Sequence, residues 1–135
     1  MNWTPLLFFN SRKVVSKEEE QSMKVIQYSE RKAIAEIEGV SRRDILTTND
    51  GASHFTMHIV EVTTHASTPT HHHPWEHEIF IINGRGIVVG ESGGTPIAEG
   101  NVVFIPDNET HCFVNTGDET LRYINIEPIK EKTES

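Results

Sequence analysis

The sequence predicts an all-β domain, and three observations lead to this prediction. From Arg42 onward, clusters of Gly, Asn, Asp and Pro mark turns about every 8 to 12 residues, a rhythm typical of a β-sandwich or β-barrel. No segment carries a sustained helical period of apolar residues, and no long internal repeat occurs. A chain of 135 residues also suits one domain around a single core.

The N-terminal residues differ in composition from the rest of the chain. Residues 1–22 pass from an apolar run to a charged run with little to bury, so we interpret them as an extension outside the domain. The apolar run is short, is interrupted by Pro5 and follows no Lys or Arg, and it therefore predicts neither a signal peptide nor a membrane span. Residues 23–135 then form the domain, beginning with a short strand over 24–28. A short docked helix over 17–24 is the alternative.

Strands and turns alternate through the rest of the chain. Asn49, Asp50 and Gly51 indicate a hairpin between a strand over 45–47 and a longer strand over 55–62. Residues 115–118 indicate another hairpin turn. The remaining strands are expected, in chain order, over 77–82, 87–89, 96–98, 101–105, 111–115 and 121–126.

Histidines are concentrated between residues 71 and 77, which hold four of the eight in the chain. If residues 70–73 are extended, His71 and His73 lie on one face and His72 on the other. Pro74 cannot donate to a sheet ladder and ends this strand, and a second strand beginning at His77 adds a third imidazole. Neutral imidazole is the commonest metal ligand among side chains, so the stretch predicts a metal site. A solvent-exposed His-rich loop is the alternative.

The spacing of this stretch resembles the first motif of the cupin superfamily. The matching pattern, within residues 65–84, is His71-x-His73, three residues, His77, six residues and Gly84. The family usually has a glutamate where His77 stands, and His65 occupies the place of a leading glycine. The segment from Pro74 to Glu78 is similar to the small cupins that have a four-histidine manganese site.

A second stretch, residues 100–115, resembles the second cupin motif. The matching pattern is Gly100, five residues, Pro106-x-Asn108, two residues, His111, three residues and Asn115. Asn108 replaces the usual glycine, and asparagine tolerates the left-handed conformation that such a turn requires.

The resemblance implies a fold, a metal site and an oligomeric state. The fold would be a double-stranded β-helix or jelly-roll (cupin) barrel, usually dimeric. A divalent metal would be held by His71, His73, His77 and His111, with Mn(II) as the expected ion and Fe(II), Zn(II) or Ni(II) as alternatives. Apolar residues opposite the His77 face of its strand also favour a covering partner, so we predict a homodimer.

The sequence predicts the metal site more specifically than it predicts the reaction. We favour a manganese- or iron-dependent oxidoreductase of the dioxygenase type that acts on a small organic substrate. A redox-neutral isomerase, lyase or decarboxylase is one alternative, and a non-catalytic small-ligand-binding cupin is another. Four neutral imidazoles would leave the double charge of the ion uncancelled, which favours an anionic substrate. No catalytic residue is assigned, because Glu76 and Glu78, the nearest carboxylates in sequence, are expected at the surface or behind the ligands.

The net charge and the cysteine content limit which binding partners and which cellular compartment we expect. A net charge of −8 makes nucleic acid and anionic membranes unsuitable partners. Cys112 is the single cysteine, which excludes an internal disulfide and fits a cytoplasmic protein. Because Cys112 follows His111 directly, it should face away from the metal.

Overall fold

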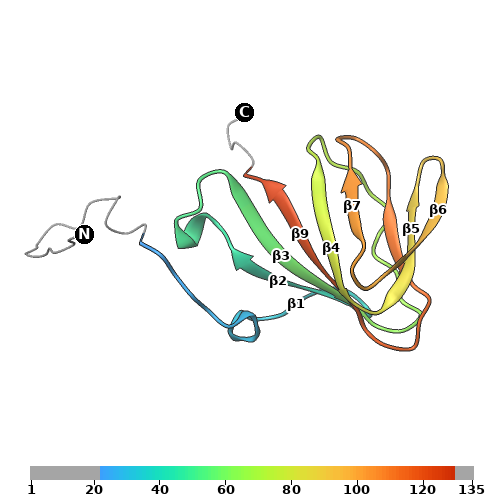
Figure 1. The fold of residues 1–135 in the computed structure, drawn as a ribbon, viewed down its shortest axis with the longest axis horizontal. Coiled ribbons are helices and arrows are strands. Elements are labelled where there is room, and N and C mark those ends of the chain that lie inside the picture. Colours follow the sequence, from blue (N-terminus) through green and yellow to red (C-terminus); the bar gives the residue numbers. More distant parts are fainter. Residues whose placement is uncertain (1–21, 130–135) are drawn as a thin grey trace, which may run out of the picture.

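A computed structural model describes residues 22–129 as an all-β structure, as predicted (Figure 1). Two short 3₁₀ helices, η2 (Tyr28–Glu30) and η3 (Thr48–Asp50), are the only helices in this range, and neither has the length that a membrane span requires. The strands are β1 (Ile34–Ile37), β2 (Val40–Leu46), β3 (Phe55–Val62), β4 (His77–Asn83), β5 (Arg85–Gly90), β6 (Gly93–Ala98), β7 (Val102–Ile105), β8 (Cys112–Asn115) and β9 (Leu121–Pro128).

The strands form two antiparallel sheets. The larger sheet has the order β1-β2-β3-β9-β4-β7, and the smaller has the order β6-β5-β8. Strand β9, the last along the chain, therefore lies between β3 and β4 in the middle of the larger sheet. This arrangement confirms the predicted jelly-roll barrel, whose interior is enclosed by the two sheets.

The core fills the barrel from the side chains that face inward. On β4, His77, Ile79 and Ile81 are buried, whereas Glu78 and Phe80 are exposed, so the strand alternates as the sequence predicted. Ile81 and Leu121 are fully buried, and each such side chain stabilises the fold by about 1.5–3 kcal/mol relative to an exposed one. The apolar core packs around Ile79 and Ile81 of β4. Polar groups lie near its first residue, His77.

Most predicted strands occur close to their expected places. Strand β3 has the predicted bounds, and β4 begins at His77. The hairpin before β3 is also confirmed, although its connection contains η3, which Gly51 ends with a left-handed φ of 100°. The stretch 70–73 is less regular than predicted, because only His71 forms a bridge, to His111.

The predicted strand over 24–28 is wrong. Residues 22–27 pair with no strand, and Tyr28 already belongs to η2. The position of η2 is fixed by contacts with β2, where the Arg43 guanidinium lies 5.6 Å from the centre of the Tyr28 ring and also donates to the carbonyl of Arg31. The predicted extension over 1–22 and the alternative helix over 17–24 lie almost wholly outside the described residues.

The predicted hairpin turn over 115–118 is also wrong. Strand β8 pairs with β5, whereas β9 pairs with β3 and β4, so this turn carries the chain from one sheet to the other. The buried Asn115 amide fixes the crossing by donating to the carbonyls of Val62 and Glu119, each at 2.8 Å. The turn residues signalled a reversal correctly, but they carried no information about which strands would pair.

Candidate metal centre

A cavity of about 480 Å³ opens at the end of the barrel where β4 begins. Its inner wall is apolar and aromatic, with Val60, Ile79, Phe113 and Tyr123 among the lining residues. Four imidazoles also line it, and these are the four that the sequence singled out: His71, His73, His77 and His111.

Backbone hydrogen bonds bring the two histidine motifs together. The amide of His71 donates to the carbonyl of His111 at 3.1 Å, and the amide of His111 donates to the carbonyl of His71 at 2.9 Å. One step further along, the amide of Asn108 donates to the carbonyl of His73 at 2.6 Å. Asn108 has a φ of 69°, the left-handed conformation expected at this position. Residues about 40 apart in the sequence thus share one short antiparallel bridge.

The four rings converge. The ring centre of His71 lies 4.6 Å from that of His73 and 4.7 Å from that of His111. The ring centre of His77 lies 4.8 Å from that of His73 and 5.4 Å from that of His111. The ligand atoms of His71, His73 and His111 lie within 4.8 Å of one another, which is close enough for the three to hold one ion.

Hydrogen bonds at the Nδ1 atoms orient three of the rings. His71 Nδ1 donates to the carbonyl of Pro69 at 2.6 Å, and His111 Nδ1 donates to that of Glu109 at 2.8 Å. His77 Nδ1 lies 3.0 Å from the side-chain oxygen of Asn125. A proton on Nδ1 leaves the Nε2 lone pair free, so that Nε2 can bind a metal.

His77 provides a direct sign that the residues fit a metal. Its side chain is buried on the first residue of β4, and its Nε2 atom has no hydrogen-bond partner. An unpaired buried polar atom destabilises a fold unless something binds it. A cation in the cavity would satisfy this atom.

The environment favours the neutral form of two of these histidines, His73 and His111. Burial, followed by the nearby His71 and His77, lowers the pKa of His73 to about 4. Burial also lowers the pKa of His111. Neutral imidazole is the form that binds metal, so these two side chains are ready to bind without losing a proton at neutral pH.

Two carboxylates in the cavity wall, Glu36 and Glu127, were not identified from the sequence, and Glu36 is paired with Arg42. Glu127 accepts a hydrogen bond of 2.6 Å from Trp75 Nε1, and the Trp75 ring stacks on His73 with 4.7 Å between ring centres. Glu76 and Glu78 are exposed, in agreement with the prediction. The alternation of β9 could have located Glu127, because it continues the inward face of Leu121, Tyr123 and Asn125.

The imidazole of His58 also contacts the Glu127 carboxylate. His58 Nε2 lies 3.4 Å from Glu127 Oε2, and His58 Nδ1 lies 2.9 Å from Asp44 Oδ1. His58 therefore contacts the Glu127 carboxylate and lies outside the set of potential metal ligands. Asp44 is in turn paired with Arg42, at 2.7 Å.

The other histidines and the cysteine lie outside this centre. His54, His65 and His72 are exposed, and Cys112 does not line the cavity. His65 has a φ of 70°, so it adopts the conformation of the glycine that it replaces in the first motif. Within residues 22–129, His71, His73 and His111 are the one set of three potential ligand side chains that lie this close together, and the predicted fourth ligand, His77, lies beside this set and not within it.

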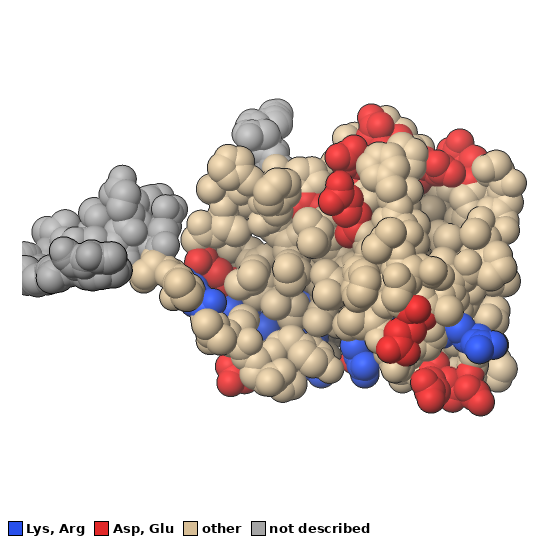
Figure 2. Space-filling model, viewed as in Figure 1, with Lys and Arg blue, Asp and Glu red and all other residues tan. Residues whose placement is uncertain are grey.

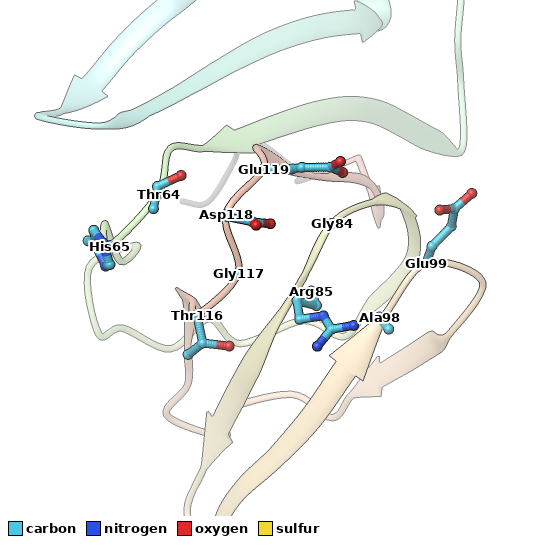
Figure 3. A pocket seen from close by; sticks show the side chains of 10 residues that line it. All are labelled: Thr64, His65, Gly84, Arg85, Ala98, Glu99, Thr116, Gly117, Asp118 and Glu119. Carbon is cyan, nitrogen blue, oxygen red and sulfur yellow. The ribbon is translucent and has the colours of Figure 1, made fainter.

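A larger hollow of about 750 Å³ lies at the end of β4 opposite the histidines, around Gly84 (Figure 3). Its acidic side chains Glu99, Asp118 and Glu119 are spread around the hollow together with Arg85, and they do not converge on one point. The geometry of this hollow indicates no metal centre.

Comparisons with known proteins agree with the motifs. A family model described as a cupin domain matches residues 58–127. No curated protein sequence matches the chain. The polyketide cyclase RemF from Streptomyces resistomycificus is 30% identical, with a TM-score of 0.74 and 83% of each chain covered.

Two more distant structures share the fold. A cupin-2 domain from Rhodospirillum rubrum is 19% identical, with a TM-score of 0.70 and coverage of 83% of this chain and 78% of that one. A protein from Thermotoga maritima described as a predicted oxalate decarboxylase is 23% identical, with a TM-score of 0.68 and coverage of 79% of this chain and 100% of that one.

The lowered pKa of His73 makes the stability of the metal-free protein depend on pH. The unfolded chain takes up a proton at this residue near its ordinary value of 6.5, whereas the folded chain does so only near 4. Protonation therefore favours the unfolded state between these values, and the melting temperature should fall as the pH falls from about 6.5 to about 4. Thermal unfolding of chelator-treated protein across this range measures the effect.

The matched variants for this test are His73→Gln and His72→Gln. His73→Gln should flatten the dependence in that window, because the titrating group is gone. His72→Gln removes an exposed imidazole and should leave the slope unchanged. An unchanged slope in His73→Gln would contradict the assignment.

Proposed function

Because the chain belongs to the cupin family, we propose that it is a divalent-metal-dependent enzyme that transforms a small organic substrate in the cavity beside Trp75 and Glu127. The observation that carries the proposal is the cluster of His71, His73 and His111, whose ligand atoms lie within 4.8 Å of one another, in the same cavity wall as the buried, unpaired Nε2 of His77. We propose His71, His73, His77 and His111 as the metal ligands.

The ligand set defines what the ion contributes. When bound, a divalent cation supplies a Lewis acid that polarises a carbonyl group or stabilises the oxyanion formed from it. Four neutral donors leave the double charge uncancelled, so the site favours a substrate that presents anionic or enolisable oxygen atoms. We retain Mn(II) as the predicted ion, with Fe(II), Zn(II) or Ni(II) as alternatives.

We propose that the reaction is redox-neutral and starts with removal of a proton from carbon next to a carbonyl. Two observations support this class, which includes cyclisation, isomerisation and decarboxylation. A polyketide cyclase is 30% identical over 83% of the chain, and the cavity contains a carboxylate placed to accept a proton. The dioxygenase reaction favoured from the sequence remains a prediction, which the oxygen measurement below also tests.

Glu127 is the base in this proposal. Its side chain is 11% exposed, and it lies in the cavity wall between the indole of Trp75 and the imidazole of His58. These contacts hold the carboxylate in one position, which is what a base must have relative to a bound substrate. Asp44 orients the His58 ring through its Nδ1 atom.

The rest of the wall suits a planar substrate. Phe113 and Tyr123 stack with 4.4 Å between ring centres, and both line the cavity with Trp75. Burial raises the pKa of Tyr123, so its hydroxyl stays protonated and can donate a hydrogen bond to a substrate oxygen. We therefore propose a small aromatic or poly-β-keto compound as the substrate class.

We also propose a cytoplasmic homodimer. The single cysteine, Cys112, supports a reducing compartment. The dimer is supported by the outward face of β4, β7 and β9, where Phe80, Val102 and Phe104 are 44%, 75% and 57% exposed. Exposed apolar patches of this kind are typical of interfaces.

The metal proposal predicts specific losses of binding. Protein purified without chelator should contain about one divalent ion per chain, measured by elemental analysis. His77→Ala should lose most of it, because His77 Nε2 is the buried unpaired atom. Asn125→Ala should weaken binding roughly 10- to 100-fold, because it frees the His77 ring.

His72→Ala is the matched control, since His72 lies in the same stretch but is exposed. Its metal content should equal that of the wild type. Full occupancy in His77→Ala would remove this residue from the ligand set, and a wild-type protein that binds none of the four ions would overturn the proposal.

The reaction proposal is tested with a simple aromatic methyl ketone as the probe, because its protons next to the carbonyl exchange only slowly in neutral water without a catalyst. Metal-loaded protein should exchange the acidic C–H protons for deuterium without oxygen, as followed by NMR. Glu127→Gln should slow the exchange roughly 10²- to 10⁴-fold, the usual contribution of a general base. Glu76→Gln, at an exposed carboxylate in the adjoining loop, should not change it.

Oxygen distinguishes the two reaction classes. Turnover that requires and consumes oxygen would support the dioxygenase prediction instead. Equal exchange rates in Glu127→Gln and the wild type would remove Glu127 as the base while leaving the metal proposal intact.

The homodimer is tested by equilibrium sedimentation at micromolar concentration. The wild type should sediment as a dimer, and Phe104→Ser should shift it toward the monomer, because it removes an apolar side chain from the interface. Phe55→Ser is the matched control, since Phe55 is 65% exposed but lies outside the proposed interface. A monomeric wild type would contradict the prediction.

A further inference from the structure

A row of polar side chains crosses the inward face of the larger sheet behind the cavity. In the strand register, His58 of β3 lies opposite Asp44 of β2 on one side and Asn125 of β9 on the other, and these strands are neighbours in Figure 1. Val60 and Val62 are buried in the core, so His58 continues the same face of β3. His58 is thus a titratable ring at the level where the apolar core ends.

The His58 ring joins two carboxylates that belong to different strands. Its Nδ1 atom lies 2.9 Å from Asp44 Oδ1, and its Nε2 atom lies 3.4 Å from Glu127 Oε2. The Thr56 hydroxyl lies 2.9 Å from the same Nε2 atom. An imidazole can accept a proton at one ring nitrogen while the other nitrogen donates a hydrogen bond, which is the property that a proton relay needs.

The side chains of this row become more exposed with distance from the cavity. Glu127 is 11% exposed, His58 is 14% exposed and Asp44 is 34% exposed. Glu127 lines the cavity, whereas His58 and Asp44 do not. A substrate in the cavity would cover Glu127 on that side and leave the row behind it open. The row therefore connects the proposed base with solvent by a path that a bound substrate does not occupy.

The charges around His58 favour a proton on its ring. Burial alone would raise the pKa of Asp44, but hydrogen bonds with Arg42 and His58 outweigh it and hold this pKa below its ordinary value. Asp44 is therefore ionised at neutral pH and stabilises a positive charge on His58 through the Nδ1 atom. Arg42 is also paired with Glu36 of β1. With Glu127 on β9, a protonated His58 would lie between two carboxylates.

We propose that His58 is a proton relay that acts through Glu127 and does not touch the substrate. The inference rests on the proposed function, in which Glu127 takes a proton from carbon next to a carbonyl. In that step the C–H bond breaks, an O–H bond forms on Glu127, and the electron pair moves on to the carbonyl oxygen of the substrate. The proton then passes from Glu127 Oε2 to His58 Nε2. The imidazolium, paired with Asp44, releases a proton to water, and Glu127 is a carboxylate again.

Proton exchange of the aromatic methyl ketone tests the relay. In metal-loaded protein, His58→Gln should slow the exchange with solvent roughly 10- to 100-fold, which is less than the loss expected in Glu127→Gln. His54→Gln is the matched control, because it removes an exposed imidazole just before β3 and should leave the rate unchanged.

An isotope comparison separates a relay from a residue that only holds Glu127 in place. The losses of deuterium and of tritium from the labelled methyl group are compared in ordinary water. In the wild type, deuterium should leave faster, because breaking the bond to carbon limits the rate. In His58→Gln the difference should shrink, because the label stays on Glu127 and returns to the same carbon. A slowed variant that keeps the full difference would overturn the relay, since a misplaced base slows the C–H step itself.

Added imidazole gives an independent readout. Figure 2 shows acidic side chains gathered along two edges of the visible face, and the net charge of −8 attracts a small base in its protonated form. Imidazole should restore exchange in His58→Ala and should not restore it in Glu127→Gln. The wild type with imidazole is the control for binding of imidazole to the metal. Restoration in Glu127→Gln as well would overturn the relay, because imidazole would then act directly on the substrate.

Asp44→Asn provides a second variant that keeps the shape of the row. It should slow the exchange and reduce the isotope difference in the same direction as His58→Gln, because it removes the charge that stabilises the imidazolium. Thermal unfolding of each variant verifies that it is folded. A wild type that exchanges and a folded His58→Gln or Asp44→Asn with the wild-type rate would overturn the relay alone. A metal-loaded wild type that exchanges no protons would overturn the proposed reaction as well.

Discussion

The pair of hydrogen bonds between His71 and His111 is the contact on which the rest of the site depends. It joins the loop that follows β3 to the segment that leads into β8, and so it connects the two motifs that supply the imidazoles. His73 lies two residues beyond this bridge, and β4 contributes His77 from the larger sheet. His71, His73 and His111 therefore depend on the register of this connection, whereas His77 is placed by the pairing of β4 with β7 and β9.

Both the proposed metal ligands and the proposed base are held in position by polar contacts with neighbouring groups. Each ring with a fixed Nδ1 atom donates to a main-chain or amide oxygen, while Glu127 is held by the indole of Trp75 and by His58. The Nδ1 atoms of His71, His77 and His111 are thus paired, whereas the Nε2 atom of His77 is buried without a partner. A site in which oriented imidazoles surround a buried nitrogen without a partner is suited to receive a cation.

Sequence patterns located what depends on local periodicity and missed what depends on pairing between distant strands. Alternation fixed the inward face of β4 and placed His77 beside the other imidazoles. Asn108 was correctly expected in a left-handed conformation, since its side chain tolerates it. Glu127 was missed because it is 50 residues from His77 and becomes its neighbour only through the position of β9. The false strand over 24–28 had a suitable composition but no neighbour with which to pair.

The place of β9 in the larger sheet has a consequence for synthesis on the ribosome. This strand is the last to emerge, yet it separates β3 from β4 and carries both Asn125 and Glu127. Before it arrives, the growing chain has two open strand edges and a half-built core, a state that is prone to association with other nascent chains. Completion of the barrel is therefore a late, all-or-none event, and a chain cut short before residue 121 would lack the fold as well as the centre.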